Sequence, residues 1–284
     1  MQRLAIDYQF LEEQCYIVRE RREQAIYTIE GEELLDRLRT EQFLVRYQSE
    51  IKGLDIQVAA TYFVASWRVL CTALHYMASL TLTRLNFQLD NLTLQIVPVH
   101  QFPMVFFVLR DDSESAWPAV ADKAVEAGES GEAGEADGWQ EQQLGSFYKE
   151  TLQPVMESVA GVSKLPVTQL WGQLPLGIAY YIKQLANRLD TAEQRERLWA
   201  DHESVKEMSA EWFGVKRNPF TIKEILVDNP YSPGEKTPLK PTCCLAYRTK
   251  TDIGYCYACP KLTKQQREEK RIELMQRQLE SSNK

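Results

Sequence analysis

The sequence lacks the short patterns that identify many nucleotide-binding and hydrolytic enzymes. Its closely spaced glycines at 128, 131, 134 and 138 do not form G-x-G-x-x-G, and no strand is expected to lead into them. With only three histidines, the chain shows no local Ser/His/Asp or Cys/His signature. Direct use of a nicotinamide cofactor and catalysis by a side-chain nucleophile are therefore not indicated.

The sequence also lacks the features of a secreted or membrane protein. No cationic start is followed by an apolar run, because Glu12 and Glu13 fall where that run would lie. We therefore expect a cytoplasmic protein, in which disulfides are rare and cysteines more often serve metal or redox chemistry. The longest apolar stretch, residues 58–80, is interrupted by Arg68 and His75, which favours a buried helix over a membrane span.

Charge is distributed unevenly along the chain. Residues 111–142 hold ten acidic side chains and one lysine, more than enough to account for the net charge of −7. Residues 213–264 carry nine Lys or Arg against four Asp or Glu. A basic region attracts anions. These cations are scattered among prolines and form no stripe, so nucleic acid is not an expected partner.

Hydrophobic periodicity predicts an α+β fold that is rich in helix and contains a small antiparallel sheet. Alternation over residues 92–97 and the apolar run 104–109 predict the two strands of a hairpin. Pro154, Pro166 and Pro175 are expected to start or kink helices. The expected helices cover residues 31–47, 55–80, 152–162, 167–189 and 192–208, with a charged surface helix after residue 262.

The composition divides the chain into two parts. Residues 1–212 form a helix-rich α+β domain, interrupted at 112–138 by a segment too poor in apolar residues to fold and therefore expected to be a mobile acidic loop. Residues 213–284 begin with a proline-rich, irregular segment and end in the tail helix. Half of the chain's twelve prolines lie after residue 218. A metal could organise this second part in place of regular secondary structure.

A few single residues have two interpretations. Cys71 and His75, on the apolar helix expected at 55–80, are interpreted as packing residues. Arg68 on the same helix either needs a partner in the core or faces a ligand cleft. His100 lies in a loop beside the strands, where contact with a ligand is the less favoured interpretation.

Four of the six cysteines form a cluster near the C-terminal end. Cys243 and Cys244 are adjacent, and after eleven intervening residues Cys256 and Cys259 form a C-x-x-C pair. Four convergent thiolates suit zinc or an iron–sulfur centre, whereas four packed core thiols are improbable in a loop-rich segment. Zinc remains an alternative, although adjacent cysteines are strained as a chelate of one small ion. The two irons of a [2Fe–2S] centre offer ligand positions farther apart.

The residues around the cysteines suit a redox centre. Tyr247, Tyr255 and Tyr257 can shield the sulfurs from water. Arg248 and Lys250 can offset the negative charge of a cluster. Shielding, nearby charge and hydrogen bonding are the factors that set an iron–sulfur potential.

The run Pro-Thr-Cys243-Cys244-Leu-Ala-Tyr, followed by Cys256-Tyr-Ala-Cys259-Pro260, resembles the C-terminal signature of the FhuF-like ferric-siderophore reductases. The resemblance covers residues 240–260, and the gap between the cysteine pairs is eleven residues here and usually ten in that family. It implies a [2Fe–2S] cluster held by Cys243, Cys244, Cys256 and Cys259. The implied activity is one-electron reduction of a ferric siderophore of the hydroxamate or citrate type, releasing Fe²⁺ in the cytoplasm.

The expected partners are a ferric siderophore and an electron donor. The sequence leaves the donor open between a ferredoxin, a flavodoxin and a separate reductase, and transient association with a membrane is compatible with this role. Because ferric chelates are often anionic, basic side chains are candidates for binding them. These candidates are Lys216, Arg217, Lys240, Arg248 and Lys250. The alternative function is a zinc- or cluster-stabilised binding or regulatory module without turnover.

Overall fold

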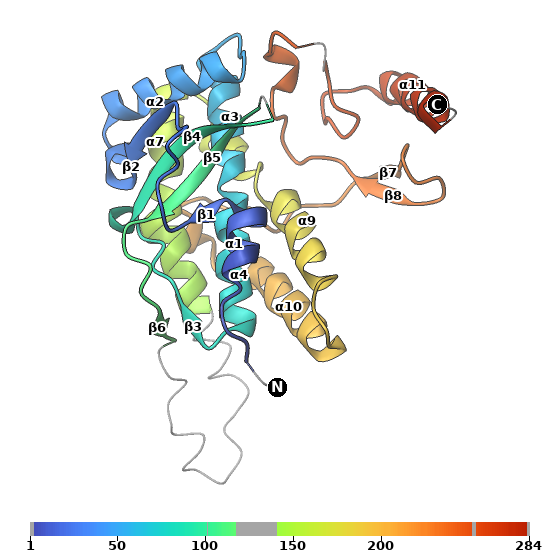
Figure 1. Cartoon of the computed structure of the whole chain (residues 1–284). Helices are drawn as coiled ribbons and strands as arrows, with labels where there is room; N and C mark the ends of the chain where they lie inside the picture. Colours follow the sequence, from blue (N-terminus) through green and yellow to red (C-terminus); the bar gives the residue numbers. More distant parts are fainter. Residues whose placement is uncertain (1–2, 101, 118–140, 252–253, 283–284) are drawn as a thin grey trace.

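A four-stranded sheet lies against a core of helices, which confirms the predicted helix-rich α+β fold (Figure 1). The structure is a computed structural model that describes residues 3–100, 102–117, 141–251 and 254–282. Its α-helices are α1 (Tyr8–Cys15), α2 (Arg37–Glu50), α3 (Ile56–Ser66), α4 (Arg68–Leu80), α7 (Gln153–Ser163), α8 (Val167–Trp171), α9 (Pro175–Ala186), α10 (Ala192–Ser204) and α11 (Lys264–Ser282). Shorter helical segments include η1 (Gly31–Leu35), the π-helix η3 (Phe147–Leu152), η5 (Ala210–Phe213) and η6 (Ala246–Arg248).

The main sheet runs in the order β1 (Ile17–Val18), β5 (Phe102–Leu109), β4 (Leu92–Val99), β2 (Tyr27–Glu30). The predicted hairpin is confirmed, because β4 pairs antiparallel with β5 over eight residue pairs. β2 is also antiparallel to β4, but β1 is parallel to β5, so the sheet is mixed at one edge. Two further antiparallel pairs of short strands are present: β3 (Thr83–Arg84) with β6 (Ser115–Ala116), and β7 (Leu226–Asp228) with β8 (Lys236–Pro238).

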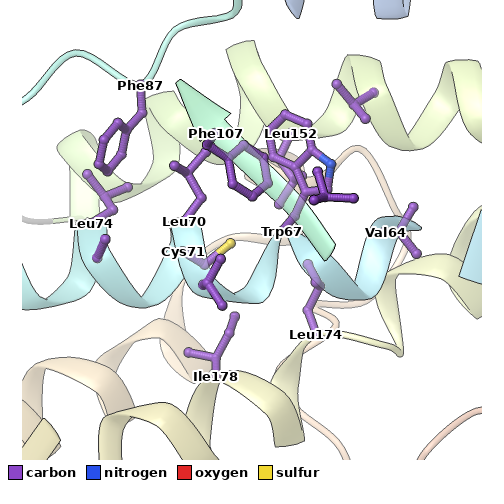
Figure 2. Close-up of a cluster of buried hydrophobic side chains, with 14 of the residues drawn as sticks. Val64, Trp67, Leu70, Cys71, Leu74, Phe87, Phe107, Leu152, Leu174 and Ile178 are labelled. Carbon is purple, nitrogen blue, oxygen red and sulfur yellow. The ribbon is translucent and has the colours of Figure 1, made fainter. Parts of the chain in front are cut away.

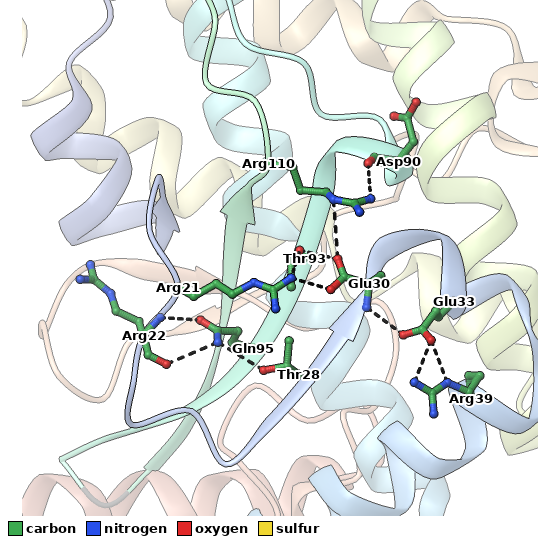
Figure 3. A network of polar contacts seen from close by, with 10 residues as sticks. All are labelled: Arg21, Arg22, Thr28, Glu30, Glu33, Arg39, Asp90, Thr93, Gln95 and Arg110. Atoms are coloured by element: carbon green, nitrogen blue, oxygen red, sulfur yellow. Dashed lines mark hydrogen bonds and ion pairs between the residues drawn. The ribbon is translucent and has the colours of Figure 1, made fainter.

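The two faces of the sheet have different surroundings, because side chains alternate along a strand. In β4, Leu94 and Ile96 join the helical core. On the opposite face Glu30 accepts hydrogen bonds from Thr93 Oγ1 and Arg21, each at 2.6 Å (Figure 3). This network satisfies polar groups that would otherwise be buried without partners.

The predicted single helix over residues 55–80 is wrong in one respect, because it is broken into α3 and α4 at Trp67. Asp55 caps α3, where it accepts hydrogen bonds from the Gln57 and Val58 amides. At the break the Trp67 amide donates to the Val64 carbonyl, which tightens one turn before α4 begins. No proline or glycine marks this position, so periodicity alone does not reveal it.

The core is built on both sides of the α3–α4 pair. Trp67 is fully buried and contacts the ring of Phe107 on β5 with ring centroids 5.2 Å apart. In Figure 2, Leu70 lies on the side of Phe107, whereas Cys71 lies on the side of Ile178 in α9. Cys71 is fully buried, so its interpretation as a packing residue is confirmed.

Two other predicted helices differ in extent. The helix expected at 167–189 is divided into α8 and α9 at Pro175, which occupies the first turn of α9, where its missing amide hydrogen is tolerated. The helix expected from Gly31 begins instead as the 3₁₀ segment η1, and α2 starts after Asp36, whose side chain accepts from the Arg39 amide.

Two histidines form a buried chain with a tyrosine. His75 Nε2 lies 2.9 Å from Tyr148 Oη, and His75 Nδ1 lies 3.3 Å from His202 Nδ1. Burial, reinforced by His202, holds the pKa of His75 well below its usual value. Burial likewise lowers the pKa of His202 to about 4. Both imidazoles are therefore neutral in the folded protein at neutral pH, and the interpretation of His75 as a core residue is confirmed.

Residues beyond 212 contribute to the same core. Phe213 and Phe220 contact the ring of Tyr148 with centroid separations of 5.0 and 5.6 Å. In Figure 1, β7, β8 and α11 extend away from this body. The division of the chain after residue 212 remains a prediction.

Two further expectations concern loops and membranes. Of the acidic loop predicted at 112–138, residues 118–138 lie outside the described residues, and its first part contains the short strand β6. In the part of the chain that the structure describes, no helix combines the length and apolar character needed to cross a bilayer.

Candidate metal centre and the cavity beside it

Side chains from the helical core hold the adjacent cysteines in place. The Thr61 hydroxyl on α3 donates to the Cys244 carbonyl at 2.7 Å. The Gln169 and Gln173 amides, on α8 and just after it, both donate to the Cys243 carbonyl at 3.4 Å. Because this segment has little regular secondary structure, its backbone groups depend on such partners.

The chain turns sharply after Cys244. Leu245 adopts a left-handed conformation with φ of 59°, and its amide donates to Cys243 Sγ at 3.4 Å. The short segment η6 follows, and its Arg248 is fixed by an ion pair with Asp55 and a hydrogen bond to Gln57 Oε1. This turn directs the two neighbouring sulfurs to different partners.

The C-x-x-C pair lies on a tight turn held by the tail helix. The Cys259 amide donates to the Cys256 carbonyl at 3.0 Å, which closes the turn. Arg267 of α11 donates to the Cys259 carbonyl at 2.7 Å and to the Tyr257 carbonyl at 3.3 Å. The predicted tail helix is therefore present, and one of its arginines is buried against the cysteine turn.

The four thiols form two pairs, each with one member from either motif. Cys243 Sγ lies 3.5 Å from Cys259 Sγ. Cys244 and Cys256 line the same cavity, and each perturbs the pKa of the other. Two thiolates on one tetrahedral metal at about 2.3 Å each would lie about 3.8 Å apart, so the Cys243–Cys259 separation is close to that of a shared metal ion.

The positions of the four sulfurs can be compared with the needs of one metal ion and of two. Among the described residues, no group of three or more His, Cys, Asp or Glu side chains is arranged to share a single ion. A mononuclear zinc site would need all four sulfurs around one point, whereas each iron of a [2Fe–2S] centre takes two protein ligands. The four thiols match the two-iron group in the chemistry of its ligands, and Cys243 and Cys259 are close enough to share one iron.

A lysine compensates negative charge at the second pair. Lys240 Nζ lies 3.4 Å from Cys244 Sγ. The neighbouring Cys256 thiol, together with Lys240, lowers the pKa of Cys244, whereas the Cys244 sulfur raises the pKa of Cys256. At the first pair, burial raises the pKa of Cys243 to about 11. The two pairs thus have different electrostatic surroundings.

The three tyrosines near the cysteines in the sequence each have a defined partner. The rings of Tyr247 and Tyr255 stack with centroids 4.4 Å apart. Lys261 lies over the Tyr247 ring and donates to its hydroxyl at 3.0 Å. Tyr257 is nearly buried, and its hydroxyl donates to the Asp228 carbonyl at 2.7 Å.

The other two cysteines lie apart from the cluster, in the core. Cys15 and Cys71 are fully buried, and burial raises the pKa of each thiol. Both belong to the hydrophobic core, which agrees with the interpretation of Cys71 as a packing residue.

A cavity of about 340 Å³ opens beside the second thiol pair. Cys244, Cys256 and Lys240 line it together with Arg68 of α4. Its volume is at the lower end of the range of about 300–1,000 Å³ that is typical of ligand sites. The larger side chains in its wall are Tyr16, Tyr47, Tyr62, Tyr181, Phe102 and Met104.

The structure separates the five basic residues predicted to bind substrate. Lys240 lines the cavity beside the thiols. Arg248 is paired with Asp55 and lines a second hollow, next to Cys243. Lys216 and Arg217 line a third hollow that contains no cysteine, and Lys250 is exposed at the surface.

The tyrosines of the cavity were not predicted, although a signal exists in the sequence. Residues of α3 and α4 at helical spacing line the cavity: Thr61, Tyr62, Ser66, Arg68 and Val69. Their hydroxyls and charge mark one side of an otherwise apolar stretch. Arg68 thus faces a cleft, which was one of its two interpretations, whereas His100 does not line this cavity.

Comparison of the chain with models of protein families found no match, and comparison with curated proteins found no significant match either.

Proposed function

We propose that the protein is a ferric-siderophore reductase of the cytoplasm, which reduces a ferric chelate of the hydroxamate or citrate type by one electron and releases Fe²⁺. The observation that carries this proposal is the arrangement of four thiols as two pairs, one of which forms part of a cavity wall. The resemblance of residues 240–260 to the FhuF-like signature points to the same chemistry.

Cys243 and Cys259 would hold one iron and Cys244 and Cys256 the other. A [2Fe–2S] centre bound there would accept and donate one electron at a time. Lys240 offsets negative charge beside Cys244, and the cavity holds the chelate next to this pair. The chelated Fe³⁺ gains one electron and becomes Fe²⁺, which hard oxygen ligands hold more weakly. No bond forms between the protein and the chelate, and no proton transfer is required.

The direct test uses reduced protein and a ferric chelate. Under anaerobic conditions the dithionite-reduced protein, freed of excess reductant, is expected to regain its visible absorption when ferric citrate is added. A ferrous-specific chromophore should report about one Fe²⁺ for each electron stored. A protein that contains zinc and stays colourless, or reduced protein that ferric chelates fail to reoxidise, would contradict the proposal.

The alternative is a zinc- or cluster-stabilised binding or regulatory module. The sparse secondary structure of the described residues 239–251 and 254–263 favours a structural role for a metal in that segment. Such a module would keep its metal and its fold in the same titration but release no Fe²⁺. Metal content alone does not separate an iron-containing module from the reductase, whereas the ferrous yield does.

The electron donor has a separate candidate face. Cys243 lines a hollow that also includes Arg248 and Lys261 and lies at the first thiol pair, whereas the cavity with Lys240 lies at the second. We propose that a ferredoxin, flavodoxin or separate reductase with an acidic docking surface approaches this hollow. Electrons would then enter at one pair and leave at the other, so donor and chelate would not compete.

Reversing a charge on that face should slow reduction by a protein donor. Lys261→Glu is expected to lower the rate of reduction by an acidic ferredoxin about 3- to 10-fold at low salt, with the difference shrinking as salt rises. Reduction by dithionite and reoxidation by ferric citrate should stay unchanged. Arg37→Glu, at the exposed start of α2, is the control and should leave all three rates unaltered. Equal ferredoxin rates in Lys261→Glu and wild type would contradict this docking face.

A further inference from the structure

Arg68 lines the cavity beside Cys244, and none of the described residues that line the cavity is an acidic partner for it. Arg68 is the first residue of α4, and its side chain crosses to α9. The aliphatic part lies against Gly177, where an added Cβ would come within 2.5 Å of Arg68 Cδ. The guanidinium lies 5.7 Å from the centroid of the Tyr181 ring. The side chain is therefore positioned by the fold at the edge of the cavity.

Arg68 has no counter-charge in the part of the chain that the structure describes. Its Nε is buried without a hydrogen-bond partner, and among the described residues no carboxylate lines the cavity around it. By contrast, Arg248 has both Asp55 and Gln57 as partners. An unpaired guanidinium in a partly apolar site is unfavourable unless something else supplies the missing acceptor.

The surroundings of Arg68 leave that position open to a ligand. None of the described residues that line the cavity is Asp or Glu. The other cation, Lys240, is already engaged with Cys244. Tyr62 and Tyr181 provide an aromatic wall on which the body of a ligand can rest. An anionic group that enters the cavity would meet Arg68 while the rest of the ligand faces the Cys244–Cys256 pair.

We propose that Arg68 binds a carboxylate of the ferric chelate and makes the cavity selective for anionic, citrate-type chelates over neutral trihydroxamates. This inference rests on the proposed function, since it assigns that substrate to this cavity. A guanidinium can bind a carboxylate through two parallel hydrogen bonds. A neutral trihydroxamate complex offers no free carboxylate and gains nothing from Arg68.

Binding can be measured without any electron transfer by using gallium(III), which has the charge of Fe³⁺ but is not reduced under these conditions. The probes are gallium(III) citrate, metal-free citrate and the gallium(III) complex of a neutral trihydroxamate, each titrated into the intact protein by calorimetry. Arg68→Gln is expected to weaken binding of gallium citrate about 10- to 100-fold, the loss expected for a charge-assisted hydrogen bond. Binding of the neutral complex should change less than about 3-fold.

Two further variants separate charge from structure. Arg68→Lys should recover part of the affinity for gallium citrate, because it keeps the charge but not the paired donors. Gly177→Ala should weaken gallium citrate binding without removing any charge, because the new methyl group displaces the Arg68 side chain. Lys183→Gln, an exposed cation on α9 outside the cavity lining, is the matched control and should bind like wild type.

The outcomes distinguish this inference from the function on which it rests. If wild type does not bind gallium citrate, or if Arg68→Gln loses both gallium complexes equally, the assignment of Arg68 is wrong even when ferric chelates reoxidise the protein. If metal-free citrate binds as tightly as gallium citrate, the site recognises the anion alone and the assignment of a chelate is wrong. If the protein lacks an iron–sulfur centre, the proposed reduction fails while the gallium titration still reports on the cavity.

Discussion

Serine in place of any one of Cys243, Cys244, Cys256 or Cys259 is expected to reduce the iron content from about two atoms per chain to near zero and to abolish the visible absorption. Each thiol belongs to a pair that would hold one iron, so the loss of one member leaves that iron with a single protein ligand. The same variants should lose all ferric-chelate reduction. Iron and sulfide analysis of protein purified without oxygen measures the effect.

The matched control is the double variant Cys15→Ser and Cys71→Ser. Both side chains are fully buried in the core, so the double variant should lose some stability, roughly 1 kcal/mol for each unfavourably buried hydroxyl. Its iron content should equal that of wild type. Loss of iron in this control, or full retention of iron in any of the four cluster variants, would show that the ligands are assigned incorrectly.

Acidification is expected to destabilise the fold through the buried histidine pair. His75 and His202 have lowered pKa values in the folded state, whereas each titrates near pH 6.5 once unfolded. Above that pH both states are neutral and the stability is fully present. As the pH falls below it, only the unfolded chain takes up the protons, and the free energy of unfolding decreases. From about pH 7 to pH 5 the loss should be roughly 3–4 kcal/mol for the two groups.

Urea unfolding across this pH range, followed by circular dichroism, checks the prediction. His202→Gln keeps a hydrogen-bonding side chain but removes one titrating group, so its loss over the same range should be only roughly 2 kcal/mol. His100→Gln at the exposed β4–β5 connection is the control and should retain the wild-type slope. An unchanged slope in His202→Gln would mean that the buried pair is not the source of the acid sensitivity.

Much of the fold follows from the sequence because its signals are local. Leu94 and Ile96 alternate with polar neighbours, and this alternation identified β4 and its core-facing side. Asp55 marked the start of α3 because a side-chain oxygen can satisfy exposed amides there. The break at Trp67 has no such signal. At this break the fully buried indole of Trp67 packs against Phe107, a residue on a strand far along the chain.

The site could be predicted only in part, for similar reasons. The four cysteines stand out because their types and spacing are read directly from the chain. Their cross-motif pairing depends on the left-handed turn at Leu245, a conformation that leucine rarely adopts and that sequence does not announce. The basic composition of residues 213–264 did not show which cations reach the cavity. Lys240 does, whereas Lys216 and Arg217 line a different hollow.

The role of Arg68 shows why the cavity needed a three-dimensional structure. The sequence indicated only that a charged residue in an apolar helix requires a partner or a cleft. Its position depends on Gly177, whose missing side chain leaves room for the arginine stem, and on Tyr181 one helical turn later. Contacts between α4 and α9 are not encoded in any local pattern.

The most direct test of the account is a low-temperature electron paramagnetic resonance spectrum of the dithionite-reduced protein, prepared without oxygen and combined with metal analysis. The account predicts a signal from a single unpaired electron that integrates to about one spin per chain, with about two irons and two sulfides. A protein that contains zinc, and shows no such signal in either oxidation state, would contradict the assignment of Cys243, Cys244, Cys256 and Cys259 to a two-iron centre.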